Sequence, residues 1–278
     1  MLIAQITDCH VVERGELLAG RVDTAAALHA AIDHLHAMSP RPDVVLATGD
    51  LVNDGLPAQY EQLASILDGL EIPVHAVPGN HDHRDELRQL FPHLPDGLHT
   101  EGRLDHVVDE YPVRLVGLDT TVPGEHGGRV SETQMSWLDR VLSSDADRPT
   151  LVFQHHPPFV TGIDWMDEVG LDGRELEAAT IARHPNVLGV VCGHVHRPIT
   201  AAFGGTVASC WPSTGAQVAL ALDGGRYRYV DDAAGVAVHR WHPVDGFVSH
   251  LSPVTSAGTW LPAWAAREAA REAAHDSM

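Results

Sequence analysis

The chain has 278 residues, with 18 Lys or Arg against 38 Asp or Glu, which gives a formal net charge of -20 at pH 7. This charge repels a phosphate backbone over most of the surface, so it excludes an extended nucleic acid polymer as the main partner. No apolar run reaches the roughly 18 residues that a membrane helix needs, so we expect no membrane partner either. Cys9, Cys192 and Cys210 are too few for a disulfide framework and are predicted to be free thiols.

The N-terminus, from Met1 to Ile6, has no basic segment and no cleavage site. The first residue with ligand chemistry is Asp8, which lies too close to the start for a cleaved leader to precede it. We therefore expect a cytoplasmic protein.

Short apolar runs alternate with amphipathic stretches over the first two-thirds of the chain. The runs are predicted to be buried strands: Leu2–Ile6, Val44–Thr48, Val74–Val77, Leu115–Leu118, Thr150–Gln154 and Val187–Cys192. The stretches between them are predicted to be helices: Asp23–Ala37, Pro57–Asp68, Arg84–Leu90, Ser131–Leu142 and Arg174–His184. This alternation predicts an α/β architecture.

From about Ile199 the pattern changes to short strand-like runs separated by glycine-containing turns. The runs are Ile199–Phe203, Thr206–Cys210, Ala216–Leu222, Arg226–Val230, Val236–Trp241 and Phe247–Leu251. They predict an antiparallel sheet layer within one domain spanning residues 1–255. The remaining residues, 256–278, are rich in Ala, Glu and Arg and are predicted to be a peripheral helical tail.

Residues with metal-binding side chains come immediately after five of the predicted strands. Asp8-Cys9-His10 follows the first, and Gly49-Asp50 and Gly79-Asn80-His81-Asp82 follow the next two. His155-His156 and Gly193-His194-Val195-His196 follow the strands at 150–154 and 187–192. Because the carboxyl ends of strands form the ligand crevice of open α/β sheets, we expect these segments to converge.

The spacing within two of these motifs is informative. Asp8 and His10 are two residues apart, so in extended backbone they point to one side while Cys9 points to the other. The same holds for His194 and His196. Carboxylate, amide and imidazole ligands together favour Fe, Mn, Zn or Co over Ca or Mg.

A carboxylate such as Asp50 can bridge two ions, which lets seven ligands serve two metals. Gly49, Gly79 and Gly193 permit tight turns and a close approach of the backbone to an ion. Each motif alone has another interpretation: Asp50 could cap a helix, and Asn80 could be a turn residue. The ordered series at strand ends favours the metal site.

These motifs resemble the signature of the calcineurin-like metallophosphoesterases, which runs D-x-H, G-D-x-x-x, G-N-H-[DE], a His-bearing strand end and G-H-x-H. The likeness covers roughly residues 2 to 220. It is strongest to class III cyclic-nucleotide phosphodiesterases and bacterial glycerophosphodiesterases, through the segments 49–55 and 155–158. The resemblance implies a four-layer α/β/β/α sandwich with a C-terminal antiparallel β layer.

The resemblance also implies roles for individual residues. One metal would bind Asp8, His10, Asp50 and His196, and the other would bind Asp50, Asn80, His155 and His194. His81 would act on the substrate as a catalytic residue together with the bridging Asp50, Asn53 would contact the substrate or support the site, and Asp82 would orient its neighbours. His156 is the alternative to His155 as a ligand.

The implied enzyme is a phosphodiesterase that hydrolyses small phosphodiesters, 3′,5′-cyclic nucleotides such as cAMP above all, with a hydroxide activated by two metals. Glycerophosphodiesters or phosphomonoesters are alternative substrates, and a catalytically silent binding scaffold is a minor alternative. Relatives also suggest a homo-oligomer, a dimer or larger. One departure concerns Ala216, which stands where several relatives carry a His in a P-[GS]-T-x-H-Q pattern.

Overall fold

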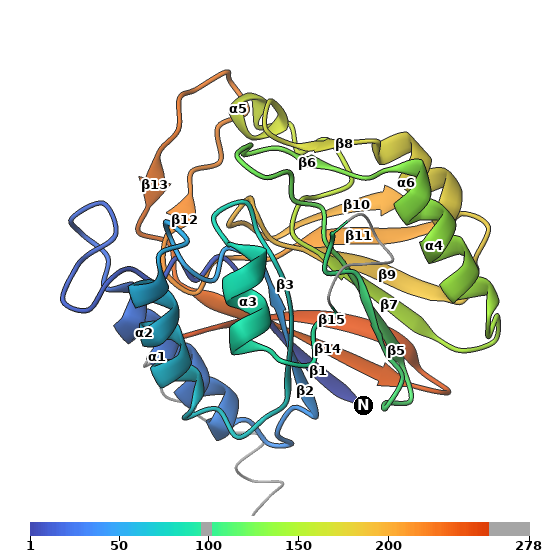
Figure 1. Cartoon of the computed structure of the whole chain (residues 1–278), viewed down its shortest axis with the longest axis horizontal. Helices are drawn as coiled ribbons and strands as arrows, with labels where there is room; N and C mark the ends of the chain where they lie inside the picture. Colours follow the sequence, from blue (N-terminus) through green and yellow to red (C-terminus); the bar gives the residue numbers. More distant parts are fainter. Residues whose placement is uncertain (96–101, 256–278) are drawn as a thin grey trace, which may run out of the picture.

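The computed structural model describes residues 1–95 and 102–255, and its elements form two mixed sheets flanked by helices (Figure 1). The helices in this part of the chain are α1 (Thr24–Ala37), α2 (Pro57–Leu67), α3 (Arg84–Leu90), α4 (Glu132–Ser143), α5 (Asp164–Asp167) and α6 (Arg174–Ile181). None of them is both long enough and apolar enough to cross a membrane.

The first sheet has the strand order β15-β14-β1-β2-β3. Its strands are β1 (Leu2–Ile6), β2 (Val44–Thr48), β3 (Val74–Val77), β14 (Gly235–His242) and β15 (Gly246–Pro253). β1, β2 and β3 run parallel, while β14 and β15 extend the sheet as an antiparallel hairpin beside β1.

The second sheet has the strand order β10-β11-β9-β7-β5-β4. Its strands are β4 (His106–Val108), β5 (Arg114–Leu118), β7 (Thr150–Gln154), β9 (Val187–Cys192), β10 (Ile199–Phe203) and β11 (Thr206–Cys210). β5, β7, β9 and β11 run parallel, and the edge strands β4 and β10 pair antiparallel. Two small ribbons, β6 (Gly128–Arg129) with β8 (Leu171–Asp172) and β12 (Gln217–Val218) with β13 (Tyr229–Val230), lie outside these sheets.

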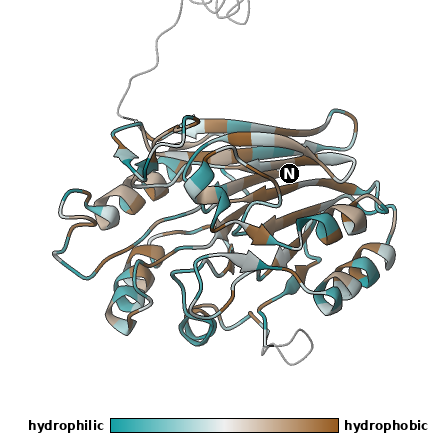
Figure 2. Cartoon of the chain, turned by 90° about the horizontal axis from the view of Figure 1, so that it is seen from above, coloured by the Kyte–Doolittle hydropathy of each residue, from teal (hydrophilic) through white to brown (hydrophobic). Residues whose placement is uncertain are grey.

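Side chains alternate between the two faces of each strand, and this alternation builds the layers. Ala4 and Ile6 of β1 pack in one core with residues of α1 and α2, whereas Ile3 packs in a second core with Leu151 and Phe153 of the other sheet. A third core joins the outer face of the second sheet to α4 and α6. Apolar residues accordingly run along the strands of both sheets (Figure 2). The predicted α/β/β/α sandwich is confirmed.

The six strands and five helices predicted before residue 199 are present, with ends that differ by up to three residues. The strands after Ile199 pair antiparallel with one another, but β11 joins β9 in parallel. They also form no separate layer, since β10 and β11 extend the second sheet and β14 and β15 extend the first. The strand predicted over Ala216–Leu222 pairs only at Gln217–Val218, and beyond it buried and exposed residues alternate, with Ala221 buried and Leu222 65% exposed. The predicted helix at 256–278 lies outside the described residues.

The three cysteines are buried free thiols, as predicted. Cys192 and Cys210 lie on the paired strands β9 and β11, where the Cys210 thiol donates to Cys192 Sγ (3.7 Å), a distance too long for a disulfide. Trp211, directly after β11, is buried between the two sheets.

The core between the sheets predicts a large stability effect for Leu46, which is fully buried there. Leu46→Ala removes apolar contacts and leaves a cavity, so we expect a loss of about 2–5 kcal/mol in the free energy of unfolding. Val244→Ala is a suitable control because Val244 is 84% exposed, and its effect should stay within about 0.5 kcal/mol. Urea denaturation of both variants measures the difference, and equal midpoints would refute this packing.

Candidate metal centre

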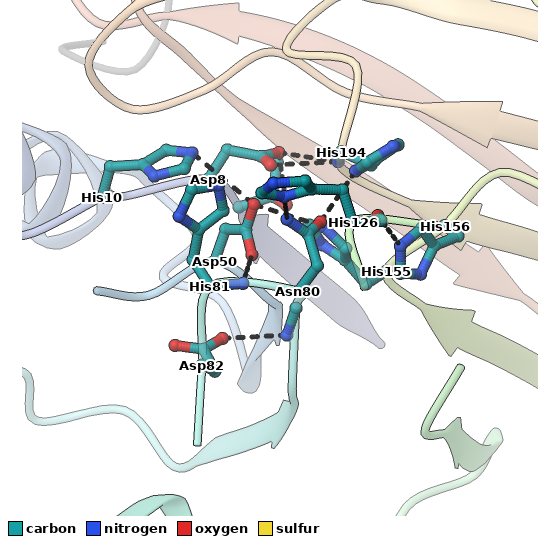
Figure 3. A network of polar contacts seen from close by, with 12 residues as sticks. Asp8, His10, Asp50, Asn80, His81, Asp82, His126, His155, His156 and His194 are labelled. Atoms are coloured by element: carbon teal, nitrogen blue, oxygen red, sulfur yellow. Dashed lines mark hydrogen bonds and ion pairs between the residues drawn. The ribbon is translucent and has the colours of Figure 1, made fainter. Parts of the chain in front are cut away.

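The carboxyl ends of β1, β2 and β3 in one sheet and of β7 and β9 in the other meet at one place. All the residues predicted to bind metal lie there together, and the close view shows His10 on one side of Asp50 with His155 and His194 on the other (Figure 3). All of them are buried except Asn80, which is partly exposed. The convergence predicted from strand order is therefore present.

The backbone at these strand ends is left-handed rather than extended. Positive φ angles occur at Asp8 (51°), His10 (43°), Asp50 (50°), His194 (70°) and His196 (52°). In the described ranges only one other non-glycine residue, Ala19, shares this conformation. The prediction of extended backbone was therefore wrong for Asp8 and His10, and equally for His194 and His196. The residues between them, Cys9 and Val195, do point away into the helix-side cores. Such strained residues gather at functional sites because surrounding contacts hold them.

Glycines let the strand ends approach one another closely. A Cβ on Gly193 would lie 1.9 Å from Thr7 Oγ1, and one on Gly79 would lie 2.2 Å from the backbone N of Asp50. Gly49 has a φ of 90°, and its Cβ would lie 2.5 Å from His155 Nδ1. The sequence predicted that these glycines permit tight turns and a close approach of the backbone to an ion. The structure shows a further role, the close approach of neighbouring loops.

One group of candidate ligands surrounds the end of β1. His10 Nε2 lies 3.2 Å from His196 Nε2 and 3.6 Å from Asp50 Oδ2. His196 Nε2 lies 3.3 Å from Asp8 Oδ1. These are the four residues that the resemblance assigned to the first metal.

A second group surrounds Asn80. Its Oδ1 lies 3.2 Å from His155 Nε2 and 3.1 Å from His194 Nδ1. His155 Nε2 is also 3.3 Å from Asp50 Oδ2, the same oxygen that faces His10 in the first group. Asp50 Oδ2 thus lies between the two groups, as a bridging carboxylate must.

Backbone carbonyls orient three of the imidazoles. His155 Nδ1 donates to Thr48 O (2.8 Å), His196 Nδ1 donates to Ala216 O (2.7 Å), and His194 Nε2 donates to Val169 O (3.1 Å). The other ring nitrogen of each His then faces the centre. Metal-bound histidines are typically held in this way, so the donor set fits transition-metal ions.

The charges of the site favour cations. Burial alone would raise the pKa of Asp8, but the imidazoles of His196 and His155 lower it below its ordinary value. Burial likewise opposes ionisation of Asp50, yet His155 and His10 hold its pKa well below the usual range. Burial lowers the pKa of His155, but the charge of Asp50 outweighs this effect and raises that pKa to about 9. Two ionised carboxylates are therefore buried among imidazoles, which is a favourable place for metal ions.

Asp82 ties two of the loops together, as predicted. Its carboxylate accepts hydrogen bonds from the backbone N–H groups of Leu51 (3.1 Å), Val52 (3.2 Å) and Gly79 (2.9 Å). Burial and the nearby Asp50 charge raise the pKa of Asp82 to about 7. Asp82 thus fixes the position of Asp50 relative to Asn80 without facing the centre itself.

His81 is positioned by Asn53, which was predicted to support the site or contact the substrate. The Nδ1–H of His81 donates to the backbone oxygen of Asn53 (2.5 Å), while the Asn53 side chain donates to Asp54 Oδ2 (3.0 Å). The backbone N–H of His81 donates to Asp50 Oδ1 (2.9 Å). His81 is half-buried and lines the cavity, which leaves its Nε2 available to a bound molecule.

His156 has a different setting from His155. Its Nδ1 lies 2.8 Å from Thr120 Oγ1, and its Nε2 donates to the backbone oxygen of His126 (3.0 Å). Both ring nitrogens are therefore engaged away from Asp50, although the ring lies beside that of His194, with centroids 4.5 Å apart and planes tilted by 48°. Thus His156 holds the loop that carries His126, while His155 faces the centre.

The cations near the motifs are already paired. Arg84 binds Asp119 Oδ2 (2.6 Å), which is fully buried, and the Thr121 carbonyl (2.9 Å). Arg197 donates to the Val218 carbonyl (2.6 Å) and lies 3.6 Å from Asp232. Neither guanidinium lines the cavity.

A cavity of about 350 Å³ opens over the centre. One wall carries His10, Asp50, Asn80, His81, His194 and His196, and Asn53 lies beside them. The other residues of the lining were not predicted from the sequence: His126, Trp165, Met166, Val169, Val218, Tyr227 and Tyr229. They lie outside any motif, in loops, the short helix α5 and the β12–β13 ribbon, so no spacing pattern singles them out.

Comparison with known proteins agrees with this geometry. Residues 1–198 match the calcineurin-like phosphoesterase family. The chain is 33% identical over 254 residues to a probable glycerophosphodiester phosphodiesterase, GpdQ, of Arcobacter nitrofigilis, covering 91% of this chain and 93% of the relative. It is 30% identical to a cAMP/cGMP dual specificity phosphodiesterase of Mycobacterium tuberculosis, covering 96% and 84% of the two chains.

A dimetal phosphatase from Danio rerio shares the fold, with a TM-score of 0.63, 17% identity and coverage of 92% of this chain and 99% of that one. The family match spans most of the chain and includes every strand end described above. The chain therefore belongs to the calcineurin-like phosphoesterase family and is a hydrolase.

Proposed function

We propose that this protein is a two-metal phosphodiesterase for small diesters, with 3′,5′-cyclic nucleotides as the leading substrates and glycerophosphodiesters second. The observation that carries the proposal is the position of Asp50 Oδ2 between two groups of donors, 3.6 Å from His10 Nε2 and 3.3 Å from His155 Nε2. The relatives named as cyclic-nucleotide and glycerophosphodiester phosphodiesterases support the substrate class.

The residues that would hold the two ions follow from the two groups. Asp8, His10, Asp50 and His196 would bind one ion, and Asp50, Asn80, His155 and His194 would bind the other. The mixture of oxygen and imidazole ligands suits Fe, Mn, Zn or Co. When bound there, the two ions would supply a hydroxide nucleophile at neutral pH and would neutralise charge on the phosphoryl oxygens.

His81 is placed to act on the leaving group. Its Nδ1 is fixed by Asn53 O (2.5 Å), and its ring lines the cavity 4.8 Å from the ring of His10. In the protonated form, Nε2–H can donate to the alkoxide oxygen that departs from phosphorus. General acid catalysis of this kind contributes about 10²–10⁴-fold to a rate.

The preference for a diester rests on charge. A diester monoanion has two non-bridging oxygens for two metals, whereas a monoester dianion gains from a further fixed cation. Arg84 and Arg197 are the cations nearest the motifs, and both are occupied by carboxylates and carbonyls. The cavity of about 350 Å³ also suits a small molecule rather than a polymer.

The remaining sequence predictions stay predictions. A catalytically silent scaffold is disfavoured because every candidate ligand is present and directed to the centre. We keep the homo-oligomer and the cytoplasmic location as proposals. β15 is an exposed edge strand, with Val248 and Leu251 41% and 43% exposed, and is a candidate surface for a dimer.

A comparison of leaving groups tests the role of His81. His81→Ala should retain bound metal but lower kcat by about 10²-fold for a diester with an alkoxide leaving group, since that oxygen must be protonated. The loss should be much smaller for a nitrophenolate, which leaves without a proton. His29→Ala, on the exposed face of α1, is the matched control. An equal decrease in kcat for both leaving groups, or loss of bound metal in His81→Ala, would exclude the role of His81 as a general acid.

A substrate pair tests the diester assignment. Metal-reconstituted protein should hydrolyse bis(4-nitrophenyl) phosphate with a higher kcat/KM than 4-nitrophenyl phosphate. In the described part of the chain, no arginine lines the cavity to balance the additional charge of the monoester. Steady-state release of nitrophenolate measures both reactions. A preference for the monoester by tenfold, about 1.4 kcal/mol in transition-state binding, would replace this proposal with a phosphomonoesterase.

A further inference from the structure

Three aromatic residues that belong to no motif form one side of the cavity. We call Trp165, Tyr227 and Tyr229 the aromatic wall; Trp165 lies in α5, Tyr229 lies in β13, and Tyr227 immediately precedes that strand. α5 and the chain between β12 and β13 lie side by side at one end of the molecule (Figure 1). Aromatic residues make up only 5% of the sequence, so three in one cavity call for an explanation.

The rings form a row that begins at a candidate metal ligand. The ring centroids of His196 and Tyr229 are 6.2 Å apart, those of Tyr229 and Tyr227 are 4.9 Å apart, and those of Tyr227 and Trp165 are 4.5 Å apart. The last two contacts are edge-to-face, with interplanar angles of 78°. A phosphodiester whose phosphate binds beside His196 therefore has its organic group next to this row of rings.

The two tyrosines of the aromatic wall belong to no hydrophobic core, whereas Trp165 is partly buried and packs against the core beneath α4 and α6. Tyr227 and Tyr229 are 48% and 37% exposed, whereas a core aromatic such as Phe153 is fully buried. Edge-to-face packing leaves part of each tyrosine open to solvent. Exposed aromatic surface beside a cavity is typical of a binding site.

The supporting segments are fixed by hydrogen bonds. Tyr229 pairs with Val218 across the β12–β13 ribbon, and Ala219 N donates to Arg228 O (2.8 Å). On the other side, Asp167 Oδ1 accepts from the backbone N–H of Thr161 (2.8 Å), which fixes the turn before α5. The wall is thus already in place before a substrate arrives, which lowers the entropic cost of binding.

We propose that the aromatic wall is a subsite for a planar ring in the organic portion of the substrate, a nucleobase or a comparable heteroaromatic group. This inference rests on the phosphodiesterase function proposed above and narrows its substrate class. A planar ring stacks on tyrosine and tryptophan faces without needing a specific hydrogen-bond partner. Val218, Met166 and Val169 add apolar surface around the same cavity.

The subsite also accounts for the substitution at residue 216. Ala216 is buried among Val12 and Leu18, and its carbonyl accepts the hydrogen bond from His196 Nδ1 (2.7 Å). Its side chain therefore does not line the cavity, whereas Tyr229 does. Contact with the organic group is thus assigned to the ring of Tyr229 rather than to residue 216.

Kinetics with ring-bearing and ring-free diesters test the subsite. In Tyr229→Leu and Tyr227→Leu, we expect KM for 3′,5′-cyclic AMP to rise about tenfold, in line with the loss of one stacking contact. KM for glycerophosphoglycerol, which has neither a ring nor a cation, should change by less than about twofold. Tyr229→Phe keeps the ring, so its KM for cyclic AMP should stay close to that of the wild-type protein. Metal content and thermal unfolding of each variant report whether the site and the fold are intact.

A measurement on the wild-type protein covers the case in which the leucine variants do not fold. AMP should inhibit more strongly than ribose 5-phosphate by about tenfold, because only AMP carries a ring for the wall. Equal inhibition constants would overturn the subsite. Equal increases in KM for both diesters in the leucine variants would also overturn it. An increase in KM confined to glycerophosphocholine would overturn it as well and would indicate a site for a quaternary ammonium. If wild-type protein hydrolyses no diester but does hydrolyse a monoester, the proposed function fails instead.

Discussion

Asp50 is a fully enclosed carboxylate with two histidines on Oδ2, His10 Nε2 at 3.6 Å and His155 Nε2 at 3.3 Å. Its other oxygen accepts the backbone N–H of His81 at 2.9 Å. Burying such a charge costs several kcal/mol unless cations or hydrogen-bond donors surround it. The rest of the centre follows from this requirement, because every neighbouring loop contributes either a donor to Asp50 or a ligand for the cation that balances it.

The fold satisfies the requirement by bringing two sheets together. His10 follows β1 of the first sheet and His155 follows β7 of the second, so Asp50 joins groups that are 145 positions apart in the chain. The apolar core between the sheets, with Ile3 and Phe153, fixes the separation of the strand ends. At that separation the loops nearly touch, and a single Cβ on Gly193 would meet Thr7 Oγ1 at 1.9 Å. The packing of the core therefore also fixes the geometry of the centre.

Much of this arrangement could be predicted from the sequence. Buried parallel strands of four to six residues are visible as β-branched runs, and ligand-type residues directly after such runs must meet at one edge. The left-handed backbone of Asp8 and Asp50 could not be predicted, because aspartate adopts it only where surrounding contacts impose it. The pairing of the strands after Ile199 was also hidden, since a hairpin pattern does not tell which sheet it joins. Tyr227 and Tyr229 carry no spacing signal and become neighbours of the centre only through the fold.

Crystals of protein reconstituted with Mn²⁺, with diffraction recorded near the manganese absorption edge, test the shared carboxylate most directly. Anomalous density should show two peaks about 3.5–4 Å apart, with Asp50 in contact with both. One peak should also contact Asp8, His10 and His196, and the other should contact Asn80, His155 and His194. A single peak, or two peaks of which Asp50 touches only one, would contradict the bridged two-metal centre.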